Sequence, residues 1–179
     1  VKVVSESKNI CENFHIPAQS GSNRILKAMN RGYTREKYLS LVDSIKKYCP
    51  EAAITTDIIV GFPGETEEDF QDTLSLMQEV QFDAAYTYIY SKRSGTPAAG
   101  FEDQIPLNVK KERLNRLMEV QNESSLAKNK LLIGKKLEVL AEGPSHSNSE
   151  FWAGRTRTNK LVLWPIMGKQ YTIGQAVNV

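Results

Sequence analysis

Apolar side chains follow two different periods along the first hundred residues. Residues 52–60 end in the β-branched run Ile58-Ile59-Val60, which is typical of a strand buried on both faces of a parallel sheet. Shorter runs predict strands at residues 13–17 and 83–90. Between the strands, apolar residues recur at helical spacing: Tyr38, Leu41, Val42, Ile45 and Tyr48, then Phe70, Leu74, Met77 and Val80. This alternation predicts an α/β fold with parallel strands.

Short polar residues that can cap a helix precede each of these helical stretches. The expected N-caps are Ser22 or Asn23 for a short helix over residues 24–29, Thr34 for the second helix and Thr66 for the third. Asp69 lies three residues after Thr66, which makes an acidic variant of the capping box. Gly32 is expected to end the short helix in the left-handed C′ position.

Beyond residue 100 the pattern changes twice. Residues 101–108 read as a linker, and residues 109–133 predict one long charged helix that ends before Gly134. Apolar and polar positions then alternate, which predicts short strands at 136–142, 151–156, 161–163 and 170–173. We expect part of a (βα) barrel over residues 1–108, a linking helix over 109–133, and a small five-stranded, OB-like all-β barrel over 134–179.

Composition and charge narrow the class of protein. Of the 179 residues, 40% are hydrophobic and 25% are charged, as in globular proteins, and no apolar run approaches the roughly 18 residues of a membrane span. The chain begins with Val1 and without a signal peptide, so we expect a cytoplasmic piece of a longer protein, with no membrane partner. Cys11 and Cys49 form no CxxC motif and are expected to be reduced thiols.

The three strands of the larger part are followed by loops that carry polar groups. These loops are Gln19–Ser22, Gly61–Glu65 and Ser91–Gly95, and parallel strands place all three on one rim. Together they offer a carboxamide, hydroxyls, backbone amides and two cations, which suit a nucleoside-like ligand. The glycines could equally serve only to turn the chain. No Ser-His-Asp or Cys-His set is present to support hydrolysis.

Other charged and aromatic residues allow two readings each. The carboxylates at 65–69 complement a helix dipole, although Glu65 belongs to the loop. Tyr86, Tyr88 and Tyr90 share one strand face, where packing is commoner than stacking on a ligand. Arg24 and Arg31 could contact the ligand or be solvated surface charges.

The last quarter of the chain carries the positive excess. Residues 133–179 contain six basic and three acidic side chains, whereas residues 1–132 contain 17 and 18. Arg155, Arg157 and Lys160 lie near Phe151 and Trp152, and this mixture of cations and aromatics suits RNA phosphates and bases. The alternative is a solvated charged hairpin with tryptophan in its core.

Several long motifs resemble those of a known family. His15-Ile16-Pro17-Ala18-Gln19-Ser20-Gly21-Ser22, Met29–Tyr33, Asp57–Thr66 and Ser91–Ala98 resemble, in this order, the radical-SAM methylthiotransferases, most closely the MiaB type that acts on tRNA. The C-terminal module looks like the TRAM domain that ends these enzymes. The resemblance covers essentially the whole chain and implies the C-terminal part of a radical-SAM α/β barrel followed by a TRAM barrel.

This resemblance implies a specific chemistry for the parent enzyme. Such enzymes use S-adenosylmethionine and a [4Fe-4S] cluster to make a 5′-deoxyadenosyl radical. The radical activates carbon 2 of an isopentenylated adenosine in the tRNA anticodon stem-loop, and a second cluster supports sulfur insertion. The cluster motif CxxxCxxC is absent here. The chain is therefore expected to lack catalytic residues and metal ligands, to be inactive alone and to need the missing N-terminal half as its partner.

The resemblance also suggests positions for ligand contacts. Gln19 and Ser20 would lie near the ribose, Gly61 and Phe62 near the adenine, and Arg31 near the carboxylate of S-adenosylmethionine. The candidate RNA contacts are Lys135, Arg155, Arg157 and Lys160. The chain departs from the usual GxIxGxxE pattern, with Asp57 at its first glycine and Gly64 at its glutamate, and from the usual Ser-Pro-Arg-Pro-Gly at 91–95.

Three other functions stay open at this point. A RimO-type methylthiotransferase modifies an aspartate of a ribosomal protein. A threonylcarbamoyladenosine tRNA methylthiotransferase belongs to the same family. The third alternative is a non-catalytic RNA-binding fragment, which an upstream CxxxCxxC in the parent reading frame would reject.

Overall fold

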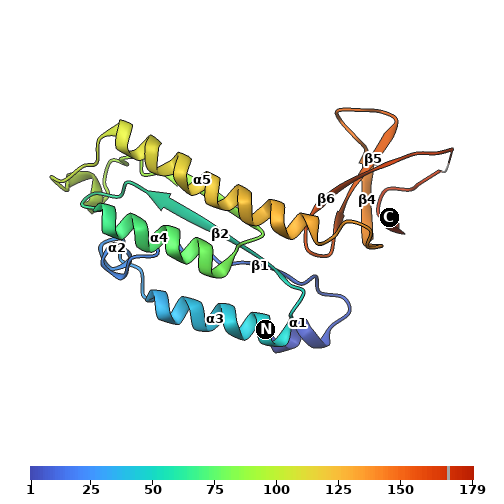
Figure 1. The fold of residues 1–179 in the computed structure, drawn as a ribbon, viewed down its shortest axis with the longest axis horizontal. Helices are drawn as coiled ribbons and strands as arrows, with labels where there is room; N and C mark the ends of the chain where they lie inside the picture. The colour runs from blue at the N-terminus through green and yellow to red at the C-terminus, as the bar shows by residue number, and fades with distance from the viewer. Residues whose placement is uncertain (169) are drawn as a thin grey trace.

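A three-stranded parallel sheet forms the centre of the larger domain. The computed structural model describes residues 1–168 and 170–179. Strands β1 (Asn13–His15), β2 (Ala53–Val60) and β3 (Ala84–Ile89) lie in that order and both neighbouring pairs are parallel (Figure 1). The prediction of a parallel α/β sheet is therefore confirmed.

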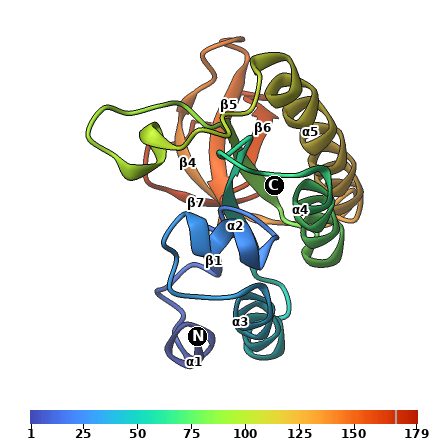
Figure 2. The same ribbon diagram turned by 90° about the vertical axis from the view of Figure 1, so that its left-hand side faces the viewer.

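Helices cover one face of this sheet. The chain forms α1 (Lys2–Glu6), α2 (Asn23–Ala28), α3 (Arg35–Tyr48), α4 (Glu67–Val80), the 3-10 helix η1 (Pro97–Gly100) and α5 (Leu107–Lys130). In Figure 2, α3, α4 and α5 follow one another along one side of the sheet. The core between them includes fully buried Ile58, Val60, Phe70 and Phe82.

The opposite face of the sheet is more open than the sequence suggested. Along β2, Ile54, Thr56, Ile58 and Val60 are buried, but the alternating residues from Thr55 to Ile59 are only half-buried. The prediction of a strand buried on both faces is therefore wrong within the described residues. The physical reason is that helices pack on one face only, so the other face keeps contact with solvent.

The predicted helix starts are confirmed, and one predicted helix end is wrong. Ser22, Thr34 and Thr66 each cap their helix, and Thr66 and Asp69 form the reciprocal capping box. Asn30, not Gly32, takes the left-handed C′ conformation, with φ of 57°. Arg31 N donates to Leu26 O at 2.9 Å and Asn30 N to Lys27 O at 3.0 Å, which is a Schellman motif. Asparagine is the residue best able to replace glycine there.

Helix α5 begins two residues before the predicted start and ends three residues early. Its buried side chains are Lys110, Arg113, Leu117 and Gln121, so three of the four are polar. Gln121 Nε2 donates to Phe82 O at 3.0 Å, which ties the middle of α5 to the start of β3. The long helix packs on the sheet through hydrogen bonds as well as through apolar contact.

The C-terminal module is a four-stranded antiparallel sheet in the order β6-β5-β4-β7. Its strands are β4 (Glu138–Pro144), β5 (Phe151–Thr156), β6 (Leu161–Pro165) and β7 (Ala176–Asn178). The all-β prediction is confirmed, but the strand predicted at 170–173 is wrong, and the described residues form four strands instead of five. The chain turns there instead, because Gln175 N donates to Thr172 O at 3.0 Å and Gly174 N to Ala141 O at 2.8 Å.

The two domains meet at the amino ends of the parallel strands. In Figure 1 the C-terminal sheet lies at the end where β2 starts, and α2 and the loops after the strands lie at the other end. Helix α5 runs between these two ends. Among the described residues no helix is both long and apolar enough to cross a membrane.

Candidate functional site

The loop after β1 is fixed beside the end of β2. Gln19 N donates to Asp57 O at 2.8 Å, and Gln19 O accepts from Ile59 N at 2.9 Å. Gln19 adopts a left-handed backbone with φ of 64°, which is uncommon for a residue with a side chain. The strand-like bridge to Ile58 holds this conformation. The first two loops of the predicted rim are thereby adjacent.

Two of the predicted ligand contacts come together on this rim. Arg31 Nη2 donates to Gln19 Oε1 at 3.0 Å. The carboxamide holds one edge of the exposed guanidinium, and the other N–H groups of Arg31 bond nothing else among the described residues. A guanidinium oriented in this way can bind a carboxylate or a phosphate.

Ser20 is turned toward the protein interior. Its hydroxyl accepts from Ser22 N at 3.2 Å and lies 3.3 Å from Thr73 Oγ1 of α4. Next to it, a Cβ on Gly21 would lie 2.3 Å from Asp72 O, so only glycine allows this close approach to α4. The contact of Ser20 with a ribose stays a prediction. In the structure, the Ser20 side chain helps to hold the loop after β1 against α4.

The loop after β2 is held in a tight turn. Gly61 has φ of 70°, and its N–H donates to Glu65 Oε1 at 2.8 Å. Phe62 is buried, with its ring 5.2 Å from that of Tyr90 and 6.3 Å from that of Phe101. An adenine contact of Gly61 and Phe62 stays a prediction, and the buried ring of Phe62 would stiffen the backbone that makes it.

A buried ion pair that the sequence did not reveal lies beneath this loop. Arg113 Nη1 of α5 lies 2.7 Å from Glu65 Oε1, and the two side chains are 6% and 1% exposed. Burial raises the pKa of Glu65, while the Gly61 amide and Arg113 act in the opposite direction. The buried face of α5 consists of Lys110, Arg113, Leu117 and Gln121, which recur at helical spacing. The apolar pattern of the sequence does not reveal this face, because three of the four residues are polar.

A second buried carboxylate joins α2 to α4. Asp69 accepts from Ser22 Oγ at 2.6 Å and from Thr66 N and Thr66 Oγ1 at 2.8 Å each, and it pairs with Arg24. Burial alone would raise the pKa of Asp69, but the hydrogen bonds from Arg24, Ser22 and Thr66 outweigh it and hold the pKa well below its usual range. Arg24 also donates to Gly64 O at 2.6 Å, so it is a structural contact of the rim.

The loop after β3 completes the rim with exposed cations. Lys92 and Arg93 are exposed, and Lys110 Nζ of α5 donates to Tyr90 O at 3.0 Å. The hydroxyl of Tyr90 is buried and has no hydrogen-bond partner among the described residues.

Polar and aromatic side chains also share the open face of the sheet. His15 Nδ1 lies 3.0 Å from Thr55 Oγ1, and His15 Nε2 lies 3.5 Å from Asp57 Oδ2. Tyr86 and Tyr88 are 52% and 53% exposed. The Tyr86 ring packs edge-on against the His15 ring, with their centres 5.9 Å apart.

The predicted RNA-binding cations divide into two groups. Arg157 and Lys160 contact the larger domain. Arg157 donates to Glu12 Oε1 at 2.9 Å, Glu12 Oε2 at 3.0 Å, Ile10 O at 2.6 Å and Lys8 O at 3.0 Å, and Lys160 Nζ lies 3.2 Å from Asp83 Oδ1. Arg155 lies 3.3 Å from Glu142 of its own sheet, and Lys135 is exposed. Their contact with RNA stays a prediction.

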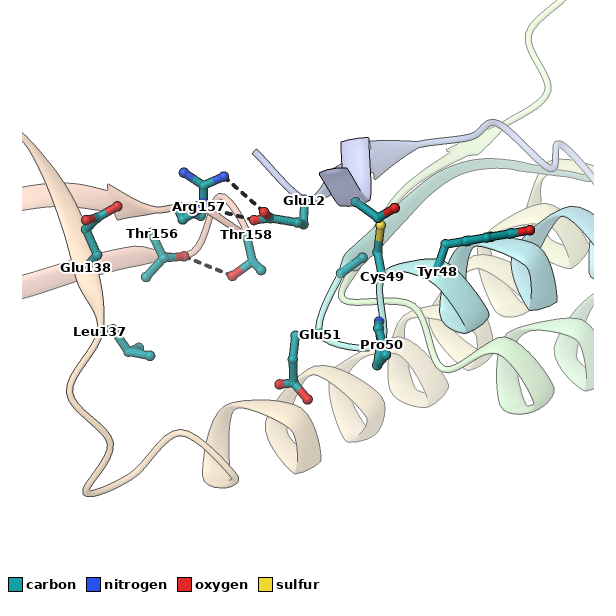
Figure 3. Close-up of a pocket in the computed structure, with 12 residues that line it drawn as sticks. Glu12, Tyr48, Cys49, Pro50, Glu51, Leu137, Glu138, Thr156, Arg157 and Thr158 are labelled. Carbon is teal, nitrogen blue, oxygen red and sulfur yellow. Dashed lines mark hydrogen bonds and ion pairs between the residues drawn. The ribbon is translucent and has the colours of Figure 1, made fainter. Parts of the chain in front are cut away.

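Figure 3 shows the junction around Arg157. A cavity of about 370 Å³ lies between the domains, lined by the end of α3, the loop after it and the start of β4. Hydrogen bonding from Arg157 holds the pKa of Glu12 below its usual value. Among the described residues, hydrogen bonds and ion pairs of Arg157 and Lys160 join the two domains beside this open cavity.

Both cysteines of the chain are free thiols. Cys11 is exposed and Cys49 is buried, and the described residues contain no group of three or more His, Cys, Asp or Glu able to hold a metal. A [4Fe-4S] cluster needs three or four cysteine ligands. The rim groups, in contrast, chemically suit S-adenosylmethionine: a guanidinium for its carboxylate and a carboxamide and backbone groups for its adenosine.

Comparison with known proteins identifies close relatives. Residues 1–77 match the Radical SAM superfamily. Over 179 residues, which is all of this chain, it is 54% identical to the tRNA-2-methylthio-N(6)-dimethylallyladenosine synthase of Moorella thermoacetica, 55% to that of Clostridium botulinum and 52% to that of Pelotomaculum thermopropionicum. The chain spans 40%, 39% and 40% of these curated relatives.

A solved structure supports the fold. Coproporphyrinogen III oxidase (HemN) from Escherichia coli, a radical SAM enzyme, aligns with a TM-score of 0.55 and 13% identity, covering 82% of this chain and 41% of that one. At this identity the likeness concerns the fold alone. It supports the α/β fold predicted for this chain.

Proposed function

Because this chain is a homologue of the tRNA-2-methylthio-N(6)-dimethylallyladenosine synthases, and its first 77 residues match the Radical SAM superfamily, we propose that it is part of such an enzyme. The enzyme would add a methylthio group to carbon 2 of N6-isopentenyladenosine next to the tRNA anticodon, in the cytoplasm. The observation that carries the proposal is identity of 54% and 55% over all of this chain.

The rim is the proposed site for part of S-adenosylmethionine. When bound with its cluster, this cofactor supplies the 5′-deoxyadenosyl radical and the methyl group. Arg31, oriented by Gln19 at 3.0 Å, would bind the carboxylate of its methionine moiety. The backbone of Gly61 and Phe62 would contact the adenine edge, and the loop of Ser20 would border the ribose. The role of these residues is to bind and orient the cofactor.

The iron–sulfur clusters belong to the remainder of the enzyme. The chain has two cysteines, which are too few for either cluster. We therefore expect this chain alone to have no methylthiotransferase activity. The N-terminal part of the parent enzyme would supply the clusters and the rest of the barrel.

The C-terminal sheet is the proposed RNA anchor. Lys135, Arg155, Arg157 and Lys160 would contribute positive charge toward the phosphates of an anticodon stem-loop. Arg157 and Lys160 are the weaker candidates, because both already pair with carboxylates of the larger domain. Lys135 and Arg155 are more exposed, and Arg155 pairs only within its own sheet, so both can approach a phosphate without breaking a contact between the domains.

Mass spectrometry of tRNA tests this function directly. The reading frame that contains this chain would be expressed in a host that lacks its own methylthiotransferase, and the digested tRNA would be analysed for 2-methylthio-N6-isopentenyladenosine. We expect the modified nucleoside with the natural protein and none with residues 1–179 alone. The proposal is wrong if soluble, cluster-loaded enzyme leaves isopentenyladenosine unmodified.

A further inference from the structure

The Glu65 carboxylate is the internal support of the Gly61–Glu65 loop. It accepts the Gly61 N–H at 2.8 Å, which closes the turn from within. Glu65 N also donates to Phe62 O at 3.0 Å. Because the Glu65 side chain is 1% exposed, solvent cannot replace these contacts at low cost.

Arg113 is the charged partner of this carboxylate, and it comes from outside the βα units. Its Nη1 donates to Glu65 Oε1 at 2.7 Å and to Glu65 O at 3.1 Å, so it binds both the side chain and the backbone of the loop. Its guanidinium also lies 5.6 Å from the centre of the Phe70 ring. Its Nε lies 3.7 Å from Glu67 Oε2 on the first turn of α4, but its shortest contacts, through Nη1, are with Glu65.

A neighbouring lysine of α5 shapes the same loop. A Cβ added to Gly61 would lie 2.4 Å from Lys110 Cγ, so the Lys110 stem packs against the glycine backbone. Lys110 Nζ then reaches Tyr90 O, at the start of the third rim loop. The first turns of α5 therefore contact two of the three loops on the rim.

We propose that Arg113 is a positioning residue for cofactor binding: it fixes Glu65, and Glu65 fixes the Gly61 amide and hence the backbone that faces the ligand. The linking helix α5 thus belongs to the cofactor site although it lies outside the strand–loop units. The inference rests on the proposed function to the extent that the ligand of this loop is S-adenosylmethionine. The contact between α5 and the loop does not depend on that identity.

The proposal has a test in the ligand-free chain. Hydrogen exchange of the Gly61 amide would be measured by NMR in the natural chain, in Arg113→Met and in the control Arg116→Met. Arg116 lies on the same helix and also stacks on Phe70, but it pairs with exposed Glu67 and Glu112. Arg113→Met removes the hydrogen bonds that hold Glu65. Because losing a hydrogen bond to a buried charge shifts an equilibrium about tenfold or more, we expect the Gly61 amide to exchange at least tenfold faster in Arg113→Met and at the natural rate in Arg116→Met. Unchanged exchange overturns the proposal that Arg113 holds Gly61 through Glu65.

A second test connects the contact between Arg113 and Glu65 to ligand binding. In the longer, cluster-loaded enzyme, the Kd for S-adenosylmethionine would be measured by equilibrium dialysis and the KM and kcat by its cleavage. Arg113→Met should raise Kd and KM about tenfold with little change in kcat, Arg113→Lys should recover part of the affinity, and Arg116→Met should behave as the natural enzyme.

The outcomes separate the inference from the function on which it rests. Faster Gly61 exchange with unchanged Kd overturns the positioning role, even if the enzyme methylthiolates tRNA. If Arg113→Met does not fold, Glu65→Gln takes its place, because the amide retains the acceptor for Gly61 but loses the charge that Arg113 holds. Failure of tRNA modification in the natural enzyme would reject the proposed function and leave the exchange result standing.

Discussion

Replacing Asp69 by alanine should destabilise the larger domain by about 3 kcal/mol. The carboxylate is the acceptor for Ser22 Oγ at 2.6 Å and for the backbone N–H of Thr66 at 2.8 Å, and its side chain is 8% exposed. Loss of the capping contact costs roughly 1 kcal/mol. The Ser22 hydroxyl, left buried without its acceptor, costs roughly 1–3 kcal/mol more. Arg24 adds little, because its half-exposed guanidinium can return to water.

The assay is urea unfolding of the full chain, followed by circular dichroism. Asp72→Ala is the matched control, because Asp72 lies one turn away on α4, is exposed, and makes no side-chain hydrogen bond among the described residues. A loss for Asp69→Ala within 0.5 kcal/mol of the control, a margin about the size of ordinary surface effects, would refute the reasoning.

The pH dependence of stability follows from the same carboxylate. The pKa of Asp69 is lowered in the folded state, so its contribution is complete above the ordinary aspartate pKa and is lost as pH falls toward the folded value. Natural and Asp69→Ala chains should therefore differ most near neutral pH and converge in acid. A difference that stayed constant down to acid would show that the charge is not involved.

The remaining predictions concern the domain junction and the rim. Arg157→Ala should let the C-terminal sheet move relative to the larger domain, because the Arg157–Glu12 pair is one of the few contacts across the junction, although its part-exposed charges contribute at most about 1 kcal/mol. Small-angle scattering should give a larger radius of gyration for Arg157→Ala and the natural radius for the control Arg155→Ala. Equal radii for the two variants would contradict this prediction. Gly61→Ala should lower the free energy of unfolding by about 1–2 kcal/mol from left-handed strain, and by more because Lys110 must move. The control is Gly95→Ala, which is also left-handed but has open space around it, and an equal loss in both variants would show that Lys110 does not crowd the loop.

Local sequence rules were sufficient for most elements of the larger domain. The capping pair Thr66 and Asp69 and the β-branched run at Ile58 specify a helix start and a strand through short-range chemistry, and both occur as predicted. Asn30, not Gly32, occupies the left-handed position after α2. Both residue types tolerate this conformation, and the hydrogen bonds from Asn30 N and Arg31 N to the last turn of α2 place it at Asn30.

The candidate site was only partly predictable. Gln19 and Arg31 belong to one motif, and the structure brings them into contact. Arg113 could not be predicted as a partner of Glu65, because the pair joins a loop to a helix 48 residues away and both charges would normally be assigned to the surface. The sequence around Arg157 predicts contact with RNA and does not reveal its partner Glu12, which lies 145 residues away in the chain.

The most direct test of the central claim is hydrogen exchange of the cluster-loaded parent enzyme with and without S-adenosylmethionine, with binding verified by dialysis. We predict that bound cofactor slows exchange in peptides that cover residues 17–22 and 60–66 and leaves β4 and β5 unchanged. Bound cofactor with no protection in either rim peptide would contradict the account, because the nucleoside would then lie elsewhere.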